Sequence, residues 1–396
     1  MTYNSLREFI SYLENENQLV RVKTPVSPEL EVTEIQTRLL SENGPAVIFE
    51  NVKNSLGTPY NLPMLVNLFG TVERVAMGLG TNSTSLRKIG ETLAFLRQPE
   101  PPEGWRDALD MLPLVRKVMN MKPKLVKYGA CQEIILTGND INLANFPIQT
   151  CWPEEPAPLI TWPIVVTQGP GSTAEDNYNL GIYRMQVTGK NSTLMRWLRH
   201  RGGAGQHRRW AQLKKDPLPA AIVIGADPGV TLAAVCPVPN TLSEYQFAGL
   251  LRNQRVKLVQ CKTIPLAVPD SAEIIIEGHV SLDEYGKEGP FGDHTGYYNS
   301  VEDFPYFTAT AITMRREPIY LSTFTGRPPD EPSILGQALN DVFVPLLIQQ
   351  FPEIHDFWLP PETCSYRMAV VSIKKNYPGH AKQIMMGVWS YLRQFM

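Results

Sequence analysis

The sequence lacks the features that mark several large classes of protein. No apolar run approaches the ~18 residues that a membrane-spanning helix needs, and no basic head followed by an apolar run marks a leader. The five cysteines are odd in number, widely spaced and never in a C-x-x-C pair, which disfavours a disulfide framework and a structural zinc site. The net charge is only −2, so nothing attracts the whole chain to nucleic acid. We expect a cytosolic protein with free thiols and no nucleic-acid partner.

What is present is enough apolar sequence for two or three packed domains. The chain has 396 residues, of which 43% are hydrophobic and 19% charged. Leu6, Phe9, Ile10 and Leu13 recur at helical spacing, and helices alternate with short apolar runs up to the three prolines within residues 98–104. This pattern predicts an N-terminal α/β domain over residues 1–125.

The next region is rich in strands and poor in helices. Eight candidate strands lie within residues 126–316, and one helix, SEYQFAGLLR, interrupts them. So many strands with so little helix favour an antiparallel sheet closed on itself over a doubly wound parallel sheet. We therefore expect an α+β or α/β multidomain chain with a central β-barrel.

Strands and helices alternate again over residues 317–396, which indicates a third, α/β domain. The last helix has an apolar face formed by Ile384, Met385, Val388, Trp389 and Leu392. A sheet would have to cover this face, but only the short run RMAVVSIK precedes it. We expect this C-terminal domain to be incomplete.

The common catalytic and nucleotide-binding motifs are missing. Glycine clusters at residues 78–83 and 200–205 do not form a dinucleotide fingerprint, and the chain has no nucleophile elbow, Walker sequence or H-E-x-x-H. The six histidines show no metal-ligand spacing.

Three segments carry more chemical information. Arg184 lies in NYNLGIYRMQ, an otherwise apolar strand, where it needs an anion; an internal salt bridge would satisfy it as well as a ligand. In MRWLRHRGGAGQHRRW, arginines and histidines surround a glycine turn, which suits a phosphate or, alternatively, a solvated basic face.

The third segment, KEGPFGDHTGYYN, sets Glu288 and Asp293 on either side of Gly-Pro-Phe-Gly. The irregular loop can bring the two carboxylates together, and apolar surroundings would then push their pKa values apart to give one acid and one permanent anion. Turn capping by Asp293 is the alternative. Asn179 and Glu244 add two oxygen ligands of the type that holds a divalent metal or potassium beside a phosphate.

Together these segments resemble one family closely. NLGIYRMQ, MRWLRHRGGA, TLSEYQFAGLLR, EGPFGDHTGYYN, TGRPPDEPSILG and GHAKQIMMGVWSYLRQFM are similar to signature stretches of the UbiD decarboxylases. Within the family, the similarity is to the branch that decarboxylates 3-polyprenyl-4-hydroxybenzoate in ubiquinone biosynthesis, and it runs from near residue 3 to the last residue.

The resemblance implies a central split β-barrel that binds prenylated FMN with a divalent metal, usually manganese, and potassium at its phosphate. Asn179 and Glu244 match the family's metal ligands, and His200 is adjacent to a third ligand position. The positions that match the flavin-binding wall are Ile182, Tyr183, Arg184, Arg196, Trp197, Leu198, Arg201, Gly202 and Lys382.

The resemblance also assigns the catalytic network to Arg184, Glu288 and Asp293. Loss of CO₂ from an aromatic ring leaves a carbanion in the ring plane that no side chain can absorb, so a cofactor must accept the electrons. Asp293 is expected to return a proton to the same carbon, while Arg184 orients the substrate and keeps Glu288 ionised.

Partners follow from the same resemblance. A separate flavin prenyltransferase would supply the cofactor, the substrate would be a lipid-tailed aromatic acid, and a complete C-terminal domain would support a homo-oligomer. A lipid-tailed substrate also favours peripheral contact of the basic stretch 116–127 with the cell membrane. Two alternatives stay open: an FMN-dependent reductase on the same barrel, and a shortened, inactive chain that binds only flavin or a partner subunit.

Overall fold

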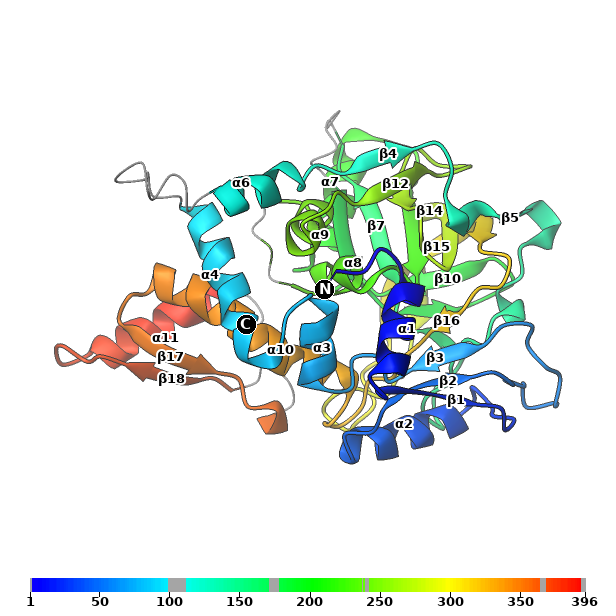
Figure 1. Ribbon diagram of the computed structural model, residues 1–396. Helices are drawn as coiled ribbons and strands as arrows, with labels where there is room; N and C mark the ends of the chain where they lie inside the picture. Colours follow the sequence, from blue (N-terminus) through cyan, green and yellow to red (C-terminus); the bar gives the residue numbers. More distant parts are fainter. Residues whose placement is uncertain are drawn as a thin grey trace.

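The computed structural model describes residues 2–98, 112–170, 178–236, 238, 242–363 and 368–392. A large curled sheet lies on one side of the molecule, the N-terminal elements lie below it, and the C-terminal hairpin and helix extend to the other side (Figure 1). Short 3-10 turns occur at Ser83–Ser85, Ala130–Gln132, Gly138–Asp140, Leu143–Asn145 and Pro361–Thr363.

The N-terminal elements form as their sequence predicts. Helix α1 buries Leu6, Phe9, Ile10 and Leu13, and Ser5 caps it by accepting a hydrogen bond from the Glu8 amide. The elements are α1 (Leu6–Asn15), β1 (Leu19–Val22), α2 (Glu31–Ser41), β2 (Ala46–Phe49), β3 (Met64–Val66), α3 (Val72–Gly78) and α4 (Leu86–Arg97).

A later segment completes the N-terminal sheet. Its strand order is β1-β2-β3-β16, and β16 (Tyr320–Leu321) lies parallel to β3 with Tyr320 opposite Met64. The chain therefore returns to its first sheet after it has built the central one.

The central sheet is antiparallel and curled. Its order is β6-β9-β10-β15-β14-β11-β7-β8, with β5 also paired to β15. The strands are β5 (Ile134–Thr137), β6 (Leu159–Ile160), β7 (Ile164–Gln168), β8 (Tyr178–Ile182), β9 (Met185–Val187), β10 (Ser192–Met195), β11 (Leu218–Ile224), β14 (Ile274–Glu288) and β15 (Glu302–Met314). Strands β6 and β8 are the two edges of this path, so the sheet curls without the closure that was expected.

Two details of the central region differ from the sequence prediction. One of the eight candidate strands, VKLVQCKTI at residues 256–264, belongs to a separate sheet of order β13-β12-β4. In this sheet β4 (Lys124–Val126) is parallel to β12 (Lys257–Gln260), and β13 (Ala267–Pro269) is antiparallel to it. Helices are also more numerous than the one expected: α7 (Gly202–Leu213), α8 (Pro228–Ala233) and α9 (Glu244–Arg252) lie in this region, and α6 (Leu112–Met119) precedes it. Helix α7 was not predicted because three glycines lie in its first turns, and glycine usually indicates a turn.

The C-terminal elements have a small core of their own. Helix α10 (Glu331–Gln350) packs on α4 and leads to the antiparallel hairpin of β17 (Ile354–Trp358) and β18 (Val370–Ile373), and α11 (His380–Tyr391) follows. Ile384, Val388 and Leu392 are buried in this core, while Met385 and Trp389 stay half-exposed. Most of the apolar face of α11 is therefore covered.

No helix in the described part of the chain is long and apolar enough to span a membrane.

Candidate active site

Two strands of the central sheet bring a pair of arginines together. Strands β9 and β10 pair with Met185 opposite Met195, and the Arg196 amide donates a hydrogen bond to the Arg184 carbonyl at 3.3 Å. Arg184 and Arg196 therefore extend this ladder as cross-strand neighbours, and the side chain of each is only 15% exposed.

A fully buried carboxylate lies between these arginines. Glu288 ends β14; its Oε1 accepts from Arg184 Nε at 2.7 Å, and its Oε2 accepts from Arg184 Nη2 at 3.1 Å and from Arg196 Nη1 at 2.7 Å. Arg184 Nη2 also donates to Asn299 Oδ1 at 2.9 Å. The internal salt bridge considered for Arg184 thus exists, and it holds the guanidinium in one orientation.

Charges of both signs gather in this cluster. The two guanidinium groups share Glu288, Arg196 forms a second, longer ion pair with the half-exposed Glu302 at 3.6 Å, and the charge of Arg184 also acts on Asp293. Each arginine lies over an aromatic ring, with Arg184 5.0 Å from the centre of Phe291 and Arg196 5.2 Å from that of Phe304. The guanidinium groups are the side chains of this cluster that could pair with a carboxylate or phosphate ligand.

Asp293 lies on the loop that follows Glu288 and pairs with its neighbour. Asp293 Oδ1 is 2.5 Å from His294 Nδ1 and also accepts the His294 backbone N–H at 2.8 Å. Burial raises the pKa of Asp293, but the hydrogen bond and charge of His294, with a smaller contribution from Arg184, lower it to about 2. In this arrangement Asp293 is an anion at neutral pH, so a proton must reach it before it can act as an acid.

The residues expected to line a flavin lie at the ends of β8 and β10 and at the start of α7. Ile182 ends β8, and Tyr183 and Arg184 lie between β8 and β9; Trp197 and Leu198 follow Arg196 beyond β10, and Arg201 and Gly202 begin α7. The Gly203 amide donates to the Tyr183 hydroxyl at 3.2 Å, and the Tyr183 and Trp197 rings meet edge to face at 6.2 Å.

The expected metal ligands meet beside the start of α7. Glu244 is the first residue of α9, whose capping box joins Ser243 and Gln246, and Glu244 Oε2 accepts from the Leu180 amide at 2.9 Å. The neighbouring Asn179 Oδ1 lies so close to Gly202 that a Cβ there would stand 2.3 Å from it.

This corner suits a cation bound to a phosphate. Asn179 offers its amide oxygen next to Gly202, and burial raises the pKa of Glu244 to about 7. A nearby cation would stabilise that carboxylate. The described residues hold no group of three or more His, Cys, Asp or Glu that could bind a metal, so phosphate oxygens or water would complete the coordination begun by Asn179 and Glu244.

Two predicted residues lie outside these contacts. His200 is exposed in the turn before α7, and no contact in the described part of the chain joins it to Asn179 or Glu244. Lys382 is exposed on α11, which Figure 1 shows well away from β10 and β15.

The sequence reasoning missed several partners in the site. It gave Arg196 a flavin contact but not the Glu288 pair, and it assigned no role to His294, Asn299 or Glu155. His294 and Asn299 lie with Asp293 in the segment KEGPFGDHTGYYN, so their polar side chains could have been predicted as its partners. Glu155 lies far from this segment in the sequence, and no local pattern connects the two.

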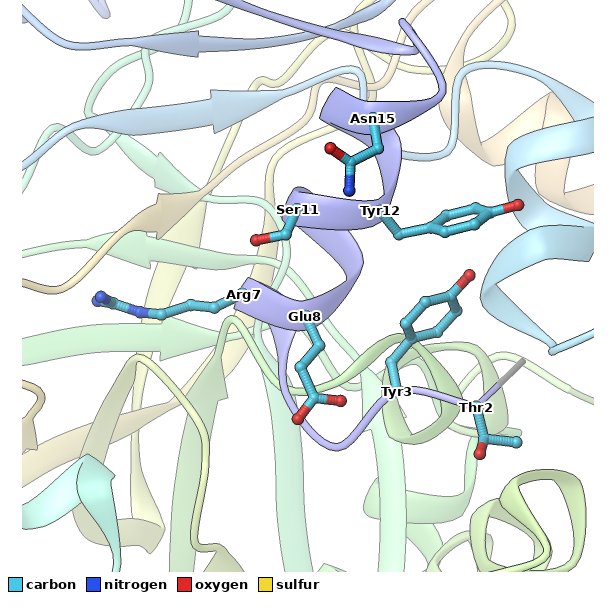
Figure 2. Close-up of a pocket in the computed structure, with 7 residues that line it drawn as sticks. All are labelled: Thr2, Tyr3, Arg7, Glu8, Ser11, Tyr12 and Asn15. Atoms are coloured by element: carbon cyan, nitrogen blue, oxygen red, sulfur yellow. The ribbon is translucent and has the colours of Figure 1, made fainter.

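A separate surface hollow of about 610 Å³ runs along α1 (Figure 2). The Tyr3 and Tyr12 rings, 5.5 Å apart, lie on one side of α1, and Arg7, which also lines the hollow, extends to the opposite side and pairs with Glu273 at 2.9 Å. None of the predicted site residues lines this hollow.

Three family models match consecutive parts of the chain. They describe the N-terminal domain (residues 10–93), the Rift-related domain (residues 124–328) and the C-terminal domain (residues 333–396) of 3-octaprenyl-4-hydroxybenzoate carboxy-lyase. The expectation of an incomplete C-terminal domain is therefore not confirmed, because the C-terminal model matches through residue 396.

Solved structures of similar chains agree with this match. An evolved dimeric form of the UbiD-class enzyme HmfF from Pelotomaculum thermopropionicum, in complex with prFMN, is 27% identical with a TM-score of 0.81, over 98% of this chain and 83% of that one. The closed form of vanillic acid decarboxylase from Sedimentibacter hydroxybenzoicus is 28% identical with a TM-score of 0.82, over 98% and 78%. The apo 3,4-dihydroxybenzoic acid decarboxylase AroY from Klebsiella pneumoniae, 21% identical with a TM-score of 0.78 over 98% and 80%, shares the fold.

Proposed function

The chain belongs to the UbiD family of carboxy-lyases, and on that premise we propose that it decarboxylates 3-polyprenyl-4-hydroxybenzoate with prenylated FMN as cofactor. One observation carries the proposal: Glu288, at the end of β14, is buried between Arg184 and Arg196, and the loop that follows it carries Asp293. The complex of the similar HmfF with prFMN supports the cofactor. The signature segments of the ubiquinone branch support the substrate.

The arginine pair would bind and orient the substrate. Their guanidinium N–H groups would pair with the substrate carboxylate, and the Glu288 carboxylate that they share holds both in orientation. The chemistry that prenylated FMN supplies when bound is an acceptor for the electron pair left on the ring carbon. The wall that holds this cofactor would be formed by Ile182, Tyr183, Trp197, Leu198, Arg201 and Gly202.

Asp293 would return the proton to the carbon that loses CO₂. His294 Nδ1, at 2.5 Å, can pass a proton to the Asp293 carboxylate, and the imidazole, 24% exposed, can recover one from solvent. One proton thus replaces each CO₂ released.

Asn179 and Glu244 would hold a divalent metal, usually manganese in the family, and potassium at the flavin phosphate, next to the first turn of α7. We propose that residues 126–316 form the cofactor-binding domain, with an N-terminal α/β domain at residues 1–125 and a C-terminal α/β domain at residues 317–396. A flavin prenyltransferase would supply the cofactor, and a homo-oligomer is the proposed assembly.

The stretch 116–127 and its neighbours support contact with a lipid surface. Met119 on α6 is 67% exposed, Leu125 on β4 is 61% exposed, and Tyr128, two residues after β4, is 76% exposed. Lys124 and Lys127 are exposed beside them. Apolar side chains among lysines suit an anionic membrane surface. We expect Lys124→Glu with Lys127→Glu to weaken binding to phosphatidylserine vesicles at least about thirtyfold, because each of the two lysines contributes ~1 kcal/mol. Unchanged sedimentation with vesicles would contradict this contact.

The central test measures first whether the protein takes up prenylated FMN and then whether it decarboxylates the proposed substrate. The chain would be produced together with a flavin prenyltransferase, and its absorption spectrum, metal content and released cofactor mass measured. It would then be assayed on 3-prenyl-4-hydroxybenzoate, vanillate and 3,4-dihydroxybenzoate. Prenylated FMN with CO₂ release from the prenylated acid is the expected result. Bound unmodified FMN with reductase activity, or protein that takes up no flavin, would overturn the proposal.

A further inference from the structure

The turn formed by residues 151–155 lies against the loop that carries Asp293. The Glu154 amide donates to the Tyr298 hydroxyl at 3.0 Å. Gly292 meets the Trp152 indole so closely that a Cβ on Gly292 would stand 2.0 Å from Trp152 Cδ1. Two residues that pair across the loop, Gly292 and Tyr298, are therefore both in contact with this turn.

Glu155 adds a polar link at the residue before Asp293. Its Oε2 accepts from the Cys151 amide at 2.6 Å, and its Oε1 accepts from the Gly292 amide at 3.4 Å. Burial raises the pKa of Glu155, while these backbone hydrogen bonds and the charge of Arg184 oppose the rise. A carboxylate that bridges two segments fixes their separation more firmly than either amide could alone.

Trp152 extends the link toward the C-terminal elements. Its Nε1 donates to the Thr325 carbonyl at 2.9 Å, and its ring meets Phe324 edge to face at 5.9 Å. A Cβ on Gly326 would lie 2.7 Å from Trp152 Cζ2. The indole is thus held between Gly292 of the loop and Gly326 of the segment that leads into α10.

We propose that Glu155 and Trp152 are positioning residues that hold the loop so that Asp293 faces the reacting carbon. This inference rests on the proposed function for its effect on turnover, but not for the link itself. Positioning matters because a misplacement of about 1 Å can lower a rate roughly a hundredfold.

The test compares Glu155→Gln with Glu154→Gln, a neighbour whose side chain is exposed and whose backbone amide survives the change. The first measurement is amide hydrogen exchange over residues 289–299 in flavin-free protein. We expect exchange about five- to tenfold faster in E155Q, because one acceptor is replaced by an amide NH₂, and unchanged exchange in E154Q. Unchanged exchange in E155Q would overturn the inference.

Turnover supplies the second measurement. In loaded protein, E155Q should lower kcat about ten- to a hundredfold, with KM and flavin content close to wild type. A raised KM with unchanged kcat would overturn the positioning role. If wild type shows no decarboxylation, the proposed function fails, while faster loop exchange in E155Q still supports the link.

Trp152→Phe is the second variant, and it allows the proposal to be tested even if E155Q does not fold. Phenylalanine keeps an aromatic ring between the glycines but removes the donor to Thr325. We expect faster exchange over residues 324–330 and also over residues 289–299. Faster exchange in the first segment alone would show that the indole does not couple the two and would overturn its part in the inference.

Discussion

At the scale of single residues, Glu288 is the side chain of the site whose substitution should destabilise the fold most. It is fully buried, and its two oxygens accept three hydrogen bonds from Arg184 and Arg196. Glu288→Gln would leave two buried guanidinium groups facing one neutral amide. We expect the free energy of unfolding to fall by about 3–5 kcal/mol, because a broken buried pair leaves uncompensated charge. Urea unfolding measures this, and Glu302→Gln is the control, since its carboxylate is half-exposed and 3.6 Å from Arg196. Equal stability of the two variants would contradict it.

Asp293 makes stability depend on pH at the acid end. Its pKa is about 2 in the folded protein, below the ordinary value of an aspartate, so it stabilises the fold at neutral pH and loses that effect as the pH falls toward 2. The contribution is about 2 kcal/mol at most, because the side chain is 27% exposed to screening solvent.

The measurement compares the unfolding free energies of wild type and Asp293→Asn at pH 6 and pH 3. The difference should fall by about half at pH 3, since the unfolded carboxyl is then largely protonated. In a His294→Gln background the difference should be smaller at pH 6, because the main partner that lowers the pKa is gone. A difference independent of pH would show that Asp293 is not held as a paired anion.

The residue scale also shows what a sequence can predict about a site. Arg184 and Glu288 were predicted together, and the structure joins them directly. The second arginine on Glu288 could not be deduced, because Arg196 reaches it through the strand order β10-β15-β14, which no local pattern encodes. Glu155 was missed for the same reason: its partner Gly292 is 137 residues further along the chain.

At the scale of elements, α7 shows how local signals can mislead. Gly202, Gly203 and Gly205 indicated a turn, but they begin a twelve-residue helix. Tertiary contact explains two of these glycines, because a Cβ on Gly202 would meet Asn179 Oδ1 at 2.3 Å and one on Gly203 would meet Trp197 Nε1 at 2.5 Å. Helices α1 and α9 were predictable because their apolar periodicity and capping residues are local.

This packing predicts opposite effects for two alanine substitutions in α7. Gly202→Ala should displace Asn179 and lower the metal and flavin content of the purified protein several-fold. Gly205→Ala meets only the flexible Arg208 Nη2 at 3.9 Å, so it should keep the cofactor and raise stability by about 0.5–1 kcal/mol. Elemental analysis, flavin absorbance and thermal unfolding measure these outcomes. Full cofactor content in G202A would contradict the placement of Asn179 at the cation corner.

At the scale of the whole molecule, two hydrophobic cores share one helix. The main core runs from Tyr3 to Leu346, and β16 and the buried Glu273, which pairs with Arg7 and Arg315, join its N-terminal and central parts. The second core contains Val344 and Leu347 of α10 together with the β17–β18 hairpin and α11. The sequence did not predict this division, because α10 is apolar on nearly every side.

The small core should therefore open by itself. Ile384 is 4% exposed and belongs only to that core, so Ile384→Ala should lower its local stability by about 2–5 kcal/mol. Hydrogen exchange should become faster in β17, β18 and α11, while β14 and β15 keep their protection. Met385→Ala is the control, because the adjacent Met385 is 50% exposed and should change little. Equally faster exchange in the central sheet of I384A would show that the two cores unfold as one unit, and that α10 transmits the loss from one to the other.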